Sequence, residues 1–256
     1  LPGGTLDGVD AVFAVGGDPL IPRRWGPVKR EAIRSSRIDL VGALAHALAR
    51  TRGEPSALVS MSAVGIYGDR RDETLTEDSP AGKGFIPDLC RAWEGAAAPA
   101  RTNGVRVVSA RSGVILGPGG GFIGKVEPAF RRGLGARLGS GRQWMSWIAL
   151  DDAVECLIRL ATDDAFAGPV NLTAPNPIRN REFTDILAET FGHRALLRIP
   201  RTAIVVATGR RVANEFLLQS ARVLPTRLLT AGTVFRLPGA ENAIRAAVEP
   251  DAFSFS

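Results

Sequence analysis

Two serines stand at the end of an apolar segment, where their hydroxyl groups could bind a ligand. Ser60 and Ser62 flank Met61 in the segment 57–62, which has the sequence ALVSMS and is typical of a buried parallel strand. Open α/β sheets bind their ligands at the carboxyl ends of such strands. A serine hydroxyl there can hydrogen-bond a carbonyl or hydroxyl group of a substrate. It can equally bond the backbone of a local turn, and this segment alone does not decide between the two.

A second candidate is the glycine-rich segment 119–124, with the sequence GGGFIG, which matches the pattern G-x-G-x-x-G. After a strand and before a helix, that pattern indicates a site for a dinucleotide pyrophosphate. The fingerprint also needs an acidic residue about 20 residues further on, to bind a ribose hydroxyl. Residues 143–147 stand at this distance and include no acid. We therefore predict that the segment has a packing or substrate-side role and does not bind the pyrophosphate.

The elements that must position these residues alternate between strands and helices. Strand-like runs cover residues 9–15, 57–62, 105–108 and 169–172, and helical patterns cover residues 28–48, 87–100 and, from Asp151 or Asp152, up to 160. This alternation predicts right-handed βαβ units and a mostly parallel sheet in an α/β protein. After Pro175 the pattern changes to helices over residues 181–191, 202–218 and 240–248, which predicts a small C-terminal lobe.

Composition excludes several classes of protein. A chain of 256 residues suffices for one large domain, or for one domain with a smaller appendage. No apolar stretch approaches the roughly 20 residues that a membrane-spanning helix needs. The two cysteines, Cys90 and Cys156, lie far apart and indicate neither a disulfide framework nor a metal site. We expect a reduced, cytoplasmic protein with no metal and no contact with a membrane.

The net charge of +6 could indicate a nucleic-acid partner, but the distribution of the charges argues against one. Only Lys29, Lys83 and Lys125 are lysines, so 29 of the 32 cations are arginines, as a bias in coding would produce. The arginines are scattered, with no run long enough to form a basic arm. We expect a small-molecule substrate and no nucleic acid.

A set of motifs in fixed order carries a family resemblance, from about Gly8 to Val248. The chain closely resembles the atypical extended short-chain dehydrogenase/reductases known as epimerase family proteins, through residues 62–68 (SAVGIYG), 77–80 (EDSP), 90–94 (CRAWE), 111–118 (RSGVILGP), 139–144 (GSGRQW), 171–175 (NLTAP), 222–225 (RVLP) and 228–232 (LLTAG).

The resemblance implies a Rossmann-like core that binds NADP(H) or NAD(H), divided into a dinucleotide-binding domain over residues 1–175 and a small substrate-side domain over residues 176–256. Residues 117–150 would contribute to the substrate side. Gly16 and Gly17 would line the adenosine side of the cofactor, and Arg37 would take the place of a helix asparagine. Ser60, Met61 and Ser62 would also contact the cofactor, with Ser62 as the surviving active-site serine.

The family's catalytic pair of tyrosine and lysine is missing from this sequence. In a Tyr-x-x-x-Lys pair the lysine lowers the pKa of the tyrosine, which then acts as general acid or base. Tyr67 is the only tyrosine, and Arg71 stands four residues after it. Alignment with the family puts Cys90 at the place of the lysine and Ile86 at the place of the tyrosine, and isoleucine cannot transfer a proton.

Cys90 could supply the missing chemistry as a thiol of low pKa, which would need a cation or a helix N-terminus nearby. A buried cysteine is otherwise a small hydrophobic residue. Because Cys90, Trp93 and Ala97 share one helical face, we predict that Cys90 is buried and slow to alkylate.

The substrate side also departs from the family. In similar sugar-nucleotide epimerases an arginine binds the substrate diphosphate, and Met145 stands at that place here, so a UDP-sugar is not expected. Trp144 and Trp147 indicate either an apolar ligand face or ordinary core packing.

The family begins with a glycine-rich strand and turn some 50 to 60 residues before the segment equivalent to residues 9–17. The chain starts at Leu1, just before that segment, so we expect a fragment of a longer protein rather than a truncated relative. Losing two charge-assisted hydrogen bonds to the pyrophosphate would weaken NADPH binding by at least about a hundredfold.

The sequence therefore predicts an NAD(P)-dependent oxidoreductase or epimerase-like protein acting on a small, partly apolar carbonyl or hydroxyl compound, with Ser62 and Cys90 as candidate catalytic residues. The alternative is a non-catalytic protein whose bound dinucleotide has a regulatory role.

Overall fold

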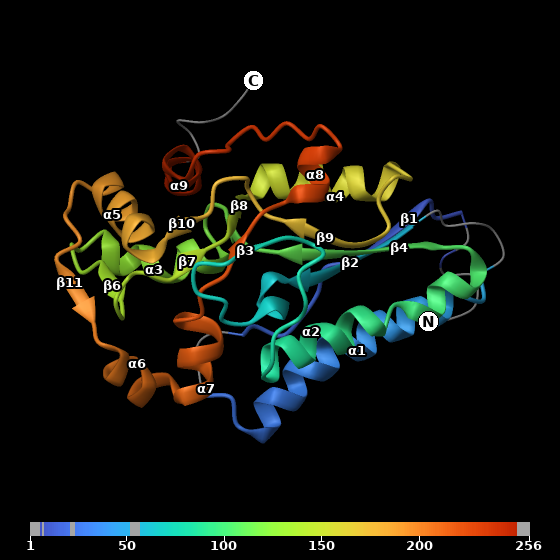
Figure 1. Cartoon of the computed structure of the whole chain (residues 1–256), viewed down its shortest axis with the longest axis horizontal. Coiled ribbons are helices and arrows are strands. Elements are labelled where there is room, and N and C mark those ends of the chain that lie inside the picture. The colour runs from blue at the N-terminus through green and yellow to red at the C-terminus, as the bar shows by residue number, and fades with distance from the viewer. Residues whose placement is uncertain (1–5, 7, 21–23, 52–56, 250–256) are drawn as a thin grey trace.

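The computed structural model describes residues 6, 8–20, 24–51 and 57–249 of the 256 in the chain. A four-stranded parallel sheet forms its centre, in the order β1 (Ala11–Ala14), β2 (Ala57–Ala63), β4 (Arg106–Ser112) and β9 (Gly168–Leu172). Helices cover both faces: α1 (Pro27–Leu48) and α2 (Phe85–Gly95) lie on one, α4 (Leu150–Thr162) and α8 (Thr226–Thr230) on the other (Figure 1). The predicted α/β fold with a mostly parallel, Rossmann-like sheet is confirmed.

Helix α1 begins where Gly26 and Pro27 favour a start, since proline at the first position loses no intrahelical hydrogen bond. Its buried stripe consists of Ile33, Arg37, Val41, Ala45 and Leu48, spaced as one face of a helix requires. Its last three members, Val41, Ala45 and Leu48, pack with Val12, Leu58, Trp93 and Val107 into a core between α1, α2 and the sheet, and Arg37 lies against the ring of Trp93. An arginine therefore occupies a core position of this helix.

The C-terminal half builds a lobe beside the carboxyl ends of the strands (Figure 1). Its core joins α3 (Gly121–Phe130), α5 (Asn180–Thr190) and α9 (Ala240–Val248) to the ribbon of β5 (Val114–Leu116) and β8 (Trp147–Ala149). Three further two-stranded ribbons complete it: β7 (Trp144–Met145) with β10 (Ile178–Arg179), β6 (Ala136–Leu138) with β11 (Leu197–Ile199), and β3 (Thr74–Leu75) with β12 (Arg222–Val223).

The helices at residues 28–48, 181–191 and 240–248 were predicted to within one residue at each end. Two predictions were wrong in extent. The helix expected over residues 87–100 ends at Gly95, and a 3-10 helix follows over Ala98–Asn103, because Pro99 cannot continue the α-helical hydrogen bonds. The helix expected over residues 202–218 is divided into α6 (Arg201–Thr208), α7 (Arg210–Val212) and a π-helical turn (Ala213–Leu217), because Gly209 adopts a positive φ of 86°.

The division into two domains at residue 175 stays a prediction. The outer ends of the two predicted domains, residues 1–5 and 250–256, lie outside the described residues. No helix in the described part of the chain is both long enough and apolar enough to cross a membrane.

Candidate functional site

The carboxyl edge of the sheet brings together the residues predicted from β1 and β2. Ser60 pairs with Ala14 at the end of β1, and Gly16 and Gly17 follow that strand directly. Both glycines are exposed, Met61 is partly exposed, and Ser60 is fully buried with its hydroxyl donating to the carbonyl of Met61 at 3.2 Å. This edge presents backbone and glycine rather than reactive side chains.

Arg37 projects from α1 to the same edge. A Cβ atom on Gly17 would lie 2.9 Å from its Cζ atom, so glycine is needed for the guanidinium to lie there. Nη1 donates to the carbonyl oxygens of Asp18 and Ile33, at 3.0 and 3.2 Å, and the group lies 5.1 Å from the ring centroid of Trp93. Although only 8% exposed, Arg37 makes no ion pair within the described residues, because the Asp18 carboxylate pairs with Lys29.

Burial lowers the pKa of the Arg37 guanidinium below its ordinary value, with nearby Cys90 and Asp18 acting in the opposite direction. The indole Nε1 of Trp93 is also buried and without a hydrogen-bond partner among the described residues. Buried polar groups usually have hydrogen-bond partners, and burying a charge without a counter-charge is far more unfavourable in free energy than burying a paired one. The surroundings of Arg37 therefore fit an anionic ligand group that accepts hydrogen bonds.

Ser62 joins a buried hydrogen-bond network that the sequence did not reveal. Its hydroxyl donates to Oε1 of Glu94 at 2.7 Å, and Glu94 also receives a bidentate pair from Arg111, with Nε at 2.9 Å and Nη2 at 3.0 Å. Arg111 stands opposite Ser62 on the neighbouring strand β4. Because the Ser62 hydroxyl donates its proton to the Glu94 carboxylate, its oxygen can accept a hydrogen bond from a ligand hydroxyl. It cannot at the same time donate a hydrogen bond to a ligand carbonyl.

Tyr67 extends the network to β9. Its hydroxyl accepts from Nη1 of Arg111 at 3.0 Å and donates to Oδ1 of Asn171 at 2.7 Å. Burial raises the pKa of Tyr67, although the adjacent Arg111 lowers it in part. Burial alone would lower the pKa of Arg111, but Glu94 and Tyr67 more than offset this and raise it. The one tyrosine of the chain is a fully buried connector and not an accessible acid.

Glu77 closes the far end of this network. Its Oε1 accepts from the backbone N–H groups of Asn171, at 3.1 Å, and of Arg227, at 3.2 Å. The carboxylate thus holds strand β9 against the start of α8, so the sheet edge and the C-terminal segment are tied together beneath Ser62.

Cys90 is 1% exposed, which confirms its predicted burial. Burial raises the pKa of the thiol to about 12, and the charge of Glu94 raises it further, while the neighbouring Ala63, Ser62 and Arg37 act in the opposite direction. A thiol in these surroundings stays protonated at neutral pH and is a poor nucleophile. Arg91 does not alter this, because it points to solvent and pairs with Asp88.

Ile86, at the place that the resemblance assigns to tyrosine, is 3% exposed and packs against the backbone of Gly65. A Cβ atom at position 65 would lie 2.5 Å from Cγ2 of Ile86, so the two residues fit only while position 65 is glycine.

The sequence left open whether Trp144 and Trp147 form an apolar ligand face or pack in the core, and the structure shows the contacts of each. Trp147 is fully buried in the core of the C-terminal lobe, and its indole N–H donates to the carbonyl of Asn176. Trp144 makes contacts with the guanidinium groups of Arg179 and Arg222, which lie 4.3 and 4.7 Å from its ring centroid. Core packing explains Trp147, and Trp144 is already engaged in cation–π contacts with two arginines.

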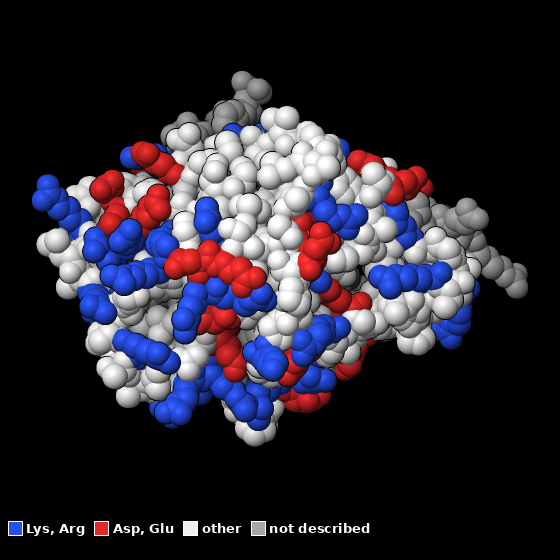
Figure 2. Space-filling model, viewed as in Figure 1, with Lys and Arg blue, Asp and Glu red and all other residues white. Residues whose placement is uncertain are grey.

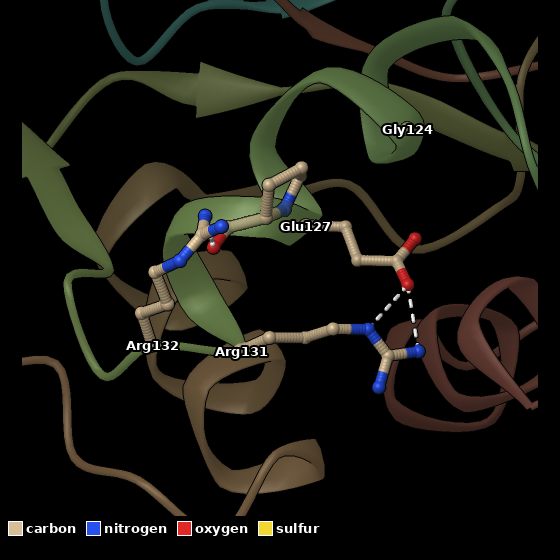
Figure 3. A pocket seen from close by; sticks show the side chains of 5 residues that line it. Gly124, Glu127, Arg131 and Arg132 are labelled. Atoms are coloured by element: carbon tan, nitrogen blue, oxygen red, sulfur yellow. Dashed lines mark hydrogen bonds and ion pairs between the residues drawn. The ribbon is translucent and has the colours of Figure 1, made fainter.

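The glycine-rich segment 119–124 opens α3, which begins at Gly121. Positive φ angles of 67° at Gly119 and 57° at Gly121 explain the need for glycine there. A pocket of about 310 Å³ lies on this helix, lined by Gly124, Glu127, Pro128, Arg131 and Arg132. Figure 3 shows Glu127 and Arg131 already joined in it as an ion pair at 2.7 Å. None of the predicted site residues lines the pocket, and the prediction that the segment does not bind pyrophosphate stays untested.

Cationic side chains gather over the C-terminal lobe in the lower left of Figure 2, with acidic side chains among them. The prediction of no nucleic-acid partner stays a prediction. Within residues 6, 8–20, 24–51 and 57–249, no three His, Cys, Asp or Glu side chains are grouped so that they could hold a metal ion.

Sequence reasoning missed the roles of Glu94, Arg111, Tyr67 and Asn171. Each lies within or beside a motif that carries the family resemblance, but their contacts join residues up to 104 positions apart. The available signal was a polar residue at a position where the strand pattern calls for an apolar one, as at Arg111 and Asn171.

Comparison with known proteins identifies the family to which the chain is similar. The family model described as NAD dependent epimerase/dehydratase matches residues 5–172. The epimerase family protein Mb2239 of Mycobacterium bovis is 42% identical over 231 residues, which are 90% of this chain and 76% of that protein. The chloroplastic epimerase family protein SDR39U1 homolog of Arabidopsis thaliana is 35% identical over 246 residues, 95% of this chain and 70% of that protein.

Solved structures show the same similarity. The crystal structure of human epimerase family protein SDR39U1 with NADPH matches with a TM-score of 0.90 and 31% identity, over 97% of this chain and 83% of that one. A UDP-galactose 4-epimerase matches with a TM-score of 0.71 at 20% identity, over 96% of this chain and 79% of that one, which is a likeness of fold alone.

Proposed function

The chain belongs to the NAD dependent epimerase/dehydratase family, and from this premise we propose that it binds NADP(H) or NAD(H) at the carboxyl edge of its four-stranded sheet. Gly16, Gly17 and Arg37 would hold the cofactor there, together with the Ser60–Met61–Ser62 strand end. The similar human protein whose crystal structure contains NADPH supports the choice of a nicotinamide dinucleotide.

The observation that carries the proposal is the buried guanidinium of Arg37. A cation that is 8% exposed and has no ion pair within the described residues needs an anionic partner to offset its desolvation. A guanidinium binds phosphate oxygens in a planar, bidentate manner. Gly17 is exposed and lies directly against this guanidinium, so an anionic group of a ligand could contact both residues.

When bound, the nicotinamide would supply hydride chemistry. The chain's own residues would orient the substrate. Ser62, with its proton held by Glu94, would accept a hydrogen bond from a substrate hydroxyl. Arg111 holds the side chain of Glu94 in place with two hydrogen bonds, and Cys90 and Ile86 provide an apolar wall that excludes water. We therefore propose a small, partly apolar hydroxyl or carbonyl compound as substrate.

Binding without turnover is the second candidate. Ser62 and Cys90 are 2% and 1% exposed, and the hydroxyl of Tyr67 is occupied on both sides, so none of these three groups is ready to transfer a proton. A protein of this kind would bind the dinucleotide for a regulatory purpose. We propose a cytoplasmic location for either function, since both cysteines are free thiols.

Calorimetric titration with NADPH and NADH tests the proposal, on protein expressed from its complete coding sequence. We expect saturable binding of one of them, weakened about tenfold or more by Arg37→Ala, since a charge-assisted hydrogen bond contributes about 1.5–3 kcal/mol. Arg34→Ala, which removes a half-buried arginine of the same helix, is the matched control and should bind like the wild type.

Absence of binding for both dinucleotides would refute the proposal, and equal affinity of the two variants would remove Arg37 from the site. Steady consumption of NADPH with any member of a panel of carbonyl compounds would favour the enzyme. Binding without consumption across the panel would favour the regulatory protein.

A further inference from the structure

The apolar cluster that contains Cys90 is completed by a segment from the far end of the chain. The apolar cluster around Cys90 contains Ile86 and Leu89 of α2, but also Val212, Phe216 and Leu217, which come more than 120 residues later. We call residues 201–217, comprising α6, α7 and the π-helical turn, the cover segment. Figure 1 shows it crossing below the sheet edge to reach the start of α2.

One polar contact fastens the cover segment to α2. Oε2 of Glu215 accepts a hydrogen bond from the backbone N–H of Ile86 at 3.2 Å. The first N–H groups of a helix lack intrahelical partners and carry a partial positive charge, so a carboxylate is favoured at this position. Cys90 lies one turn further along the same helix. The carboxylate therefore joins the cover segment to the helix that holds the thiol.

Gly84 makes this contact possible. It adopts a φ of 126°, and a Cβ atom on it would lie 2.9 Å from Oε2 of Glu215. A residue with a side chain would be strained by the backbone conformation and would also displace the carboxylate. The approach of Glu215 to α2 is thus built into the backbone at the start of the helix.

The second contact is aromatic. The ring of Phe216 meets the edge of Trp25, with centroids 6.2 Å apart, and Trp25 in turn lies 5.4 Å from Phe85 at the start of α2. Arg24 adds a hydrogen bond from Nη2 to the carbonyl of Val206 at 2.7 Å. Trp25, Phe85 and Phe216 belong to the apolar cluster around Cys90, so these contacts hold the cover segment against that cluster.

The rest of the cover segment is loosely held. Helix α6 buries only Ile204, and Val206 is 71% exposed. Gly209, with its positive φ, separates α6 from α7, and the π-helical turn is closed by a hydrogen bond from the N–H of Leu218 to the carbonyl of Ala213 at 2.8 Å. π-Helical turns often occur at functional sites, and hinges commonly absorb their motion at a few residues that end helices.

We propose that residues 201–217 form a movable cover over the Ser62–Cys90 site and that the contact of Glu215 with the start of α2 is its latch. Ligands reach Ser62 only after the latch opens, and the apolar inner face formed by Val212, Phe216 and Leu217 then packs on the bound molecule. The proposal rests on the proposed function in one respect, that Ser62 faces the ligand.

The test measures access to Cys90 without any ligand. Purified protein is treated with iodoacetamide at neutral pH, and labelling of Cys90 and of Cys156 is followed separately by peptide mass spectrometry. Cys156 is the internal control, because it is also buried, its pKa is also raised to about 12, chiefly by burial, and it lies on α4, across the sheet from the cover segment. Labelling of Cys156 reports global unfolding, and the ratio of the two rates reports local opening.

We expect Glu215→Ala to raise the ratio of Cys90 to Cys156 labelling about tenfold, which corresponds to about 1.4 kcal/mol of opening free energy. Glu215→Gln, which keeps a hydrogen-bond acceptor, should give a smaller rise and serves if the alanine variant does not fold. Glu241→Ala removes an exposed i,i+4 ion pair on α9 and should leave the ratio unchanged. In hydrogen exchange, faster exchange should be confined to residues 84–90 and 201–217.

An unchanged ratio, or an equal rise at both cysteines, would overturn the proposal, as would faster exchange spread over the whole sheet. The outcome is separate from that of the proposed function. A raised labelling ratio in a protein that binds no dinucleotide would support the movable cover and refute the proposed function. Dinucleotide binding with an unchanged labelling ratio would support the proposed function and refute the movable cover.

Discussion

Removing Glu94 is the sharpest test of the buried network at the sheet edge. Its carboxylate accepts three hydrogen bonds, one from Ser62 and two from Arg111, and the side chains of Glu94 and Arg111 are only 16% and 10% exposed. Glu94→Ala would leave the guanidinium of Arg111 buried without its counter-charge. Breaking a buried ion pair in this way costs about 3–5 kcal/mol, and we expect a loss of unfolding free energy in that range.

Glu94→Gln should lower the unfolding free energy less than Glu94→Ala does. The amide oxygen can still accept from Ser62 and from Nε of Arg111, but the amide nitrogen would face Nη2 of Arg111 at about the 3.0 Å that Oε2 now occupies. Two donors then meet, and one charge-assisted hydrogen bond is lost. The expected cost is about 1.5–3 kcal/mol, smaller than that of the alanine variant.

Urea unfolding followed by tryptophan fluorescence gives the two values, provided that the dependence on urea concentration is the same in all variants. The matched control is Glu127→Ala, which removes the i,i+4 ion pair to Arg131, a side chain that is 56% exposed. Such surface pairs contribute about 0.3–0.5 kcal/mol. A cost for Glu94→Ala no larger than that of the control would refute the buried network as a source of stability.

Three further outcomes are expected. Tyr67→Phe should lower the unfolding free energy by about 1–3 kcal/mol, because Asn171 loses its buried donor, while NADPH affinity measured by calorimetry stays the same. The pKa of Cys90 is raised from 9.0 to about 12, so the unfolded chain loses its thiol proton first and the unfolding free energy should fall as pH rises through this range. Cys90→Ala should flatten that fall, and parallel curves would contradict the assignment. Gly65→Ala should cost about 1–3 kcal/mol through the clash with Ile86, and adding Ile86→Ala should cost less than the sum of the single changes in a double-mutant cycle.

Local signals in the sequence predicted most of the fold. Helix α1 follows from Gly26-Pro27 and the spacing of its apolar residues, and the same reasoning located β2 and α9. The two helices whose extent was predicted wrongly have a sequence that favours helix, but each is interrupted at a single residue. The alanine run 96–98 favours helix, yet Pro99 ends the α-helical pattern of α2. Gly209 likewise divides a helix that the apolar pattern alone would have made continuous.

The candidate site was less predictable because its contacts are not local. Motif reasoning selected Ser62 and Cys90, and burial of Cys90 followed from its helical face. The partner of Ser62, by contrast, is Glu94, 32 residues away on α2, and the network continues to β4 and β9. Only the pairing of the strands brings Ser62 beside Arg111, and no spacing in the sequence expresses that register.

The close fit of Ile86 on Gly65 also bears on how such a sequence can evolve. A tyrosine at position 86 would have to fit where the isoleucine already lies against the backbone, and a lysine at position 90 would bury an ammonium group where the thiol is 1% exposed. Each change is harmful before the other is present, because an unpaired buried ammonium and an overpacked core both destabilise the protein. Restoring a Tyr-x-x-x-Lys pair to this chain would therefore require further changes in the packing around Gly65, Ile86 and Cys90.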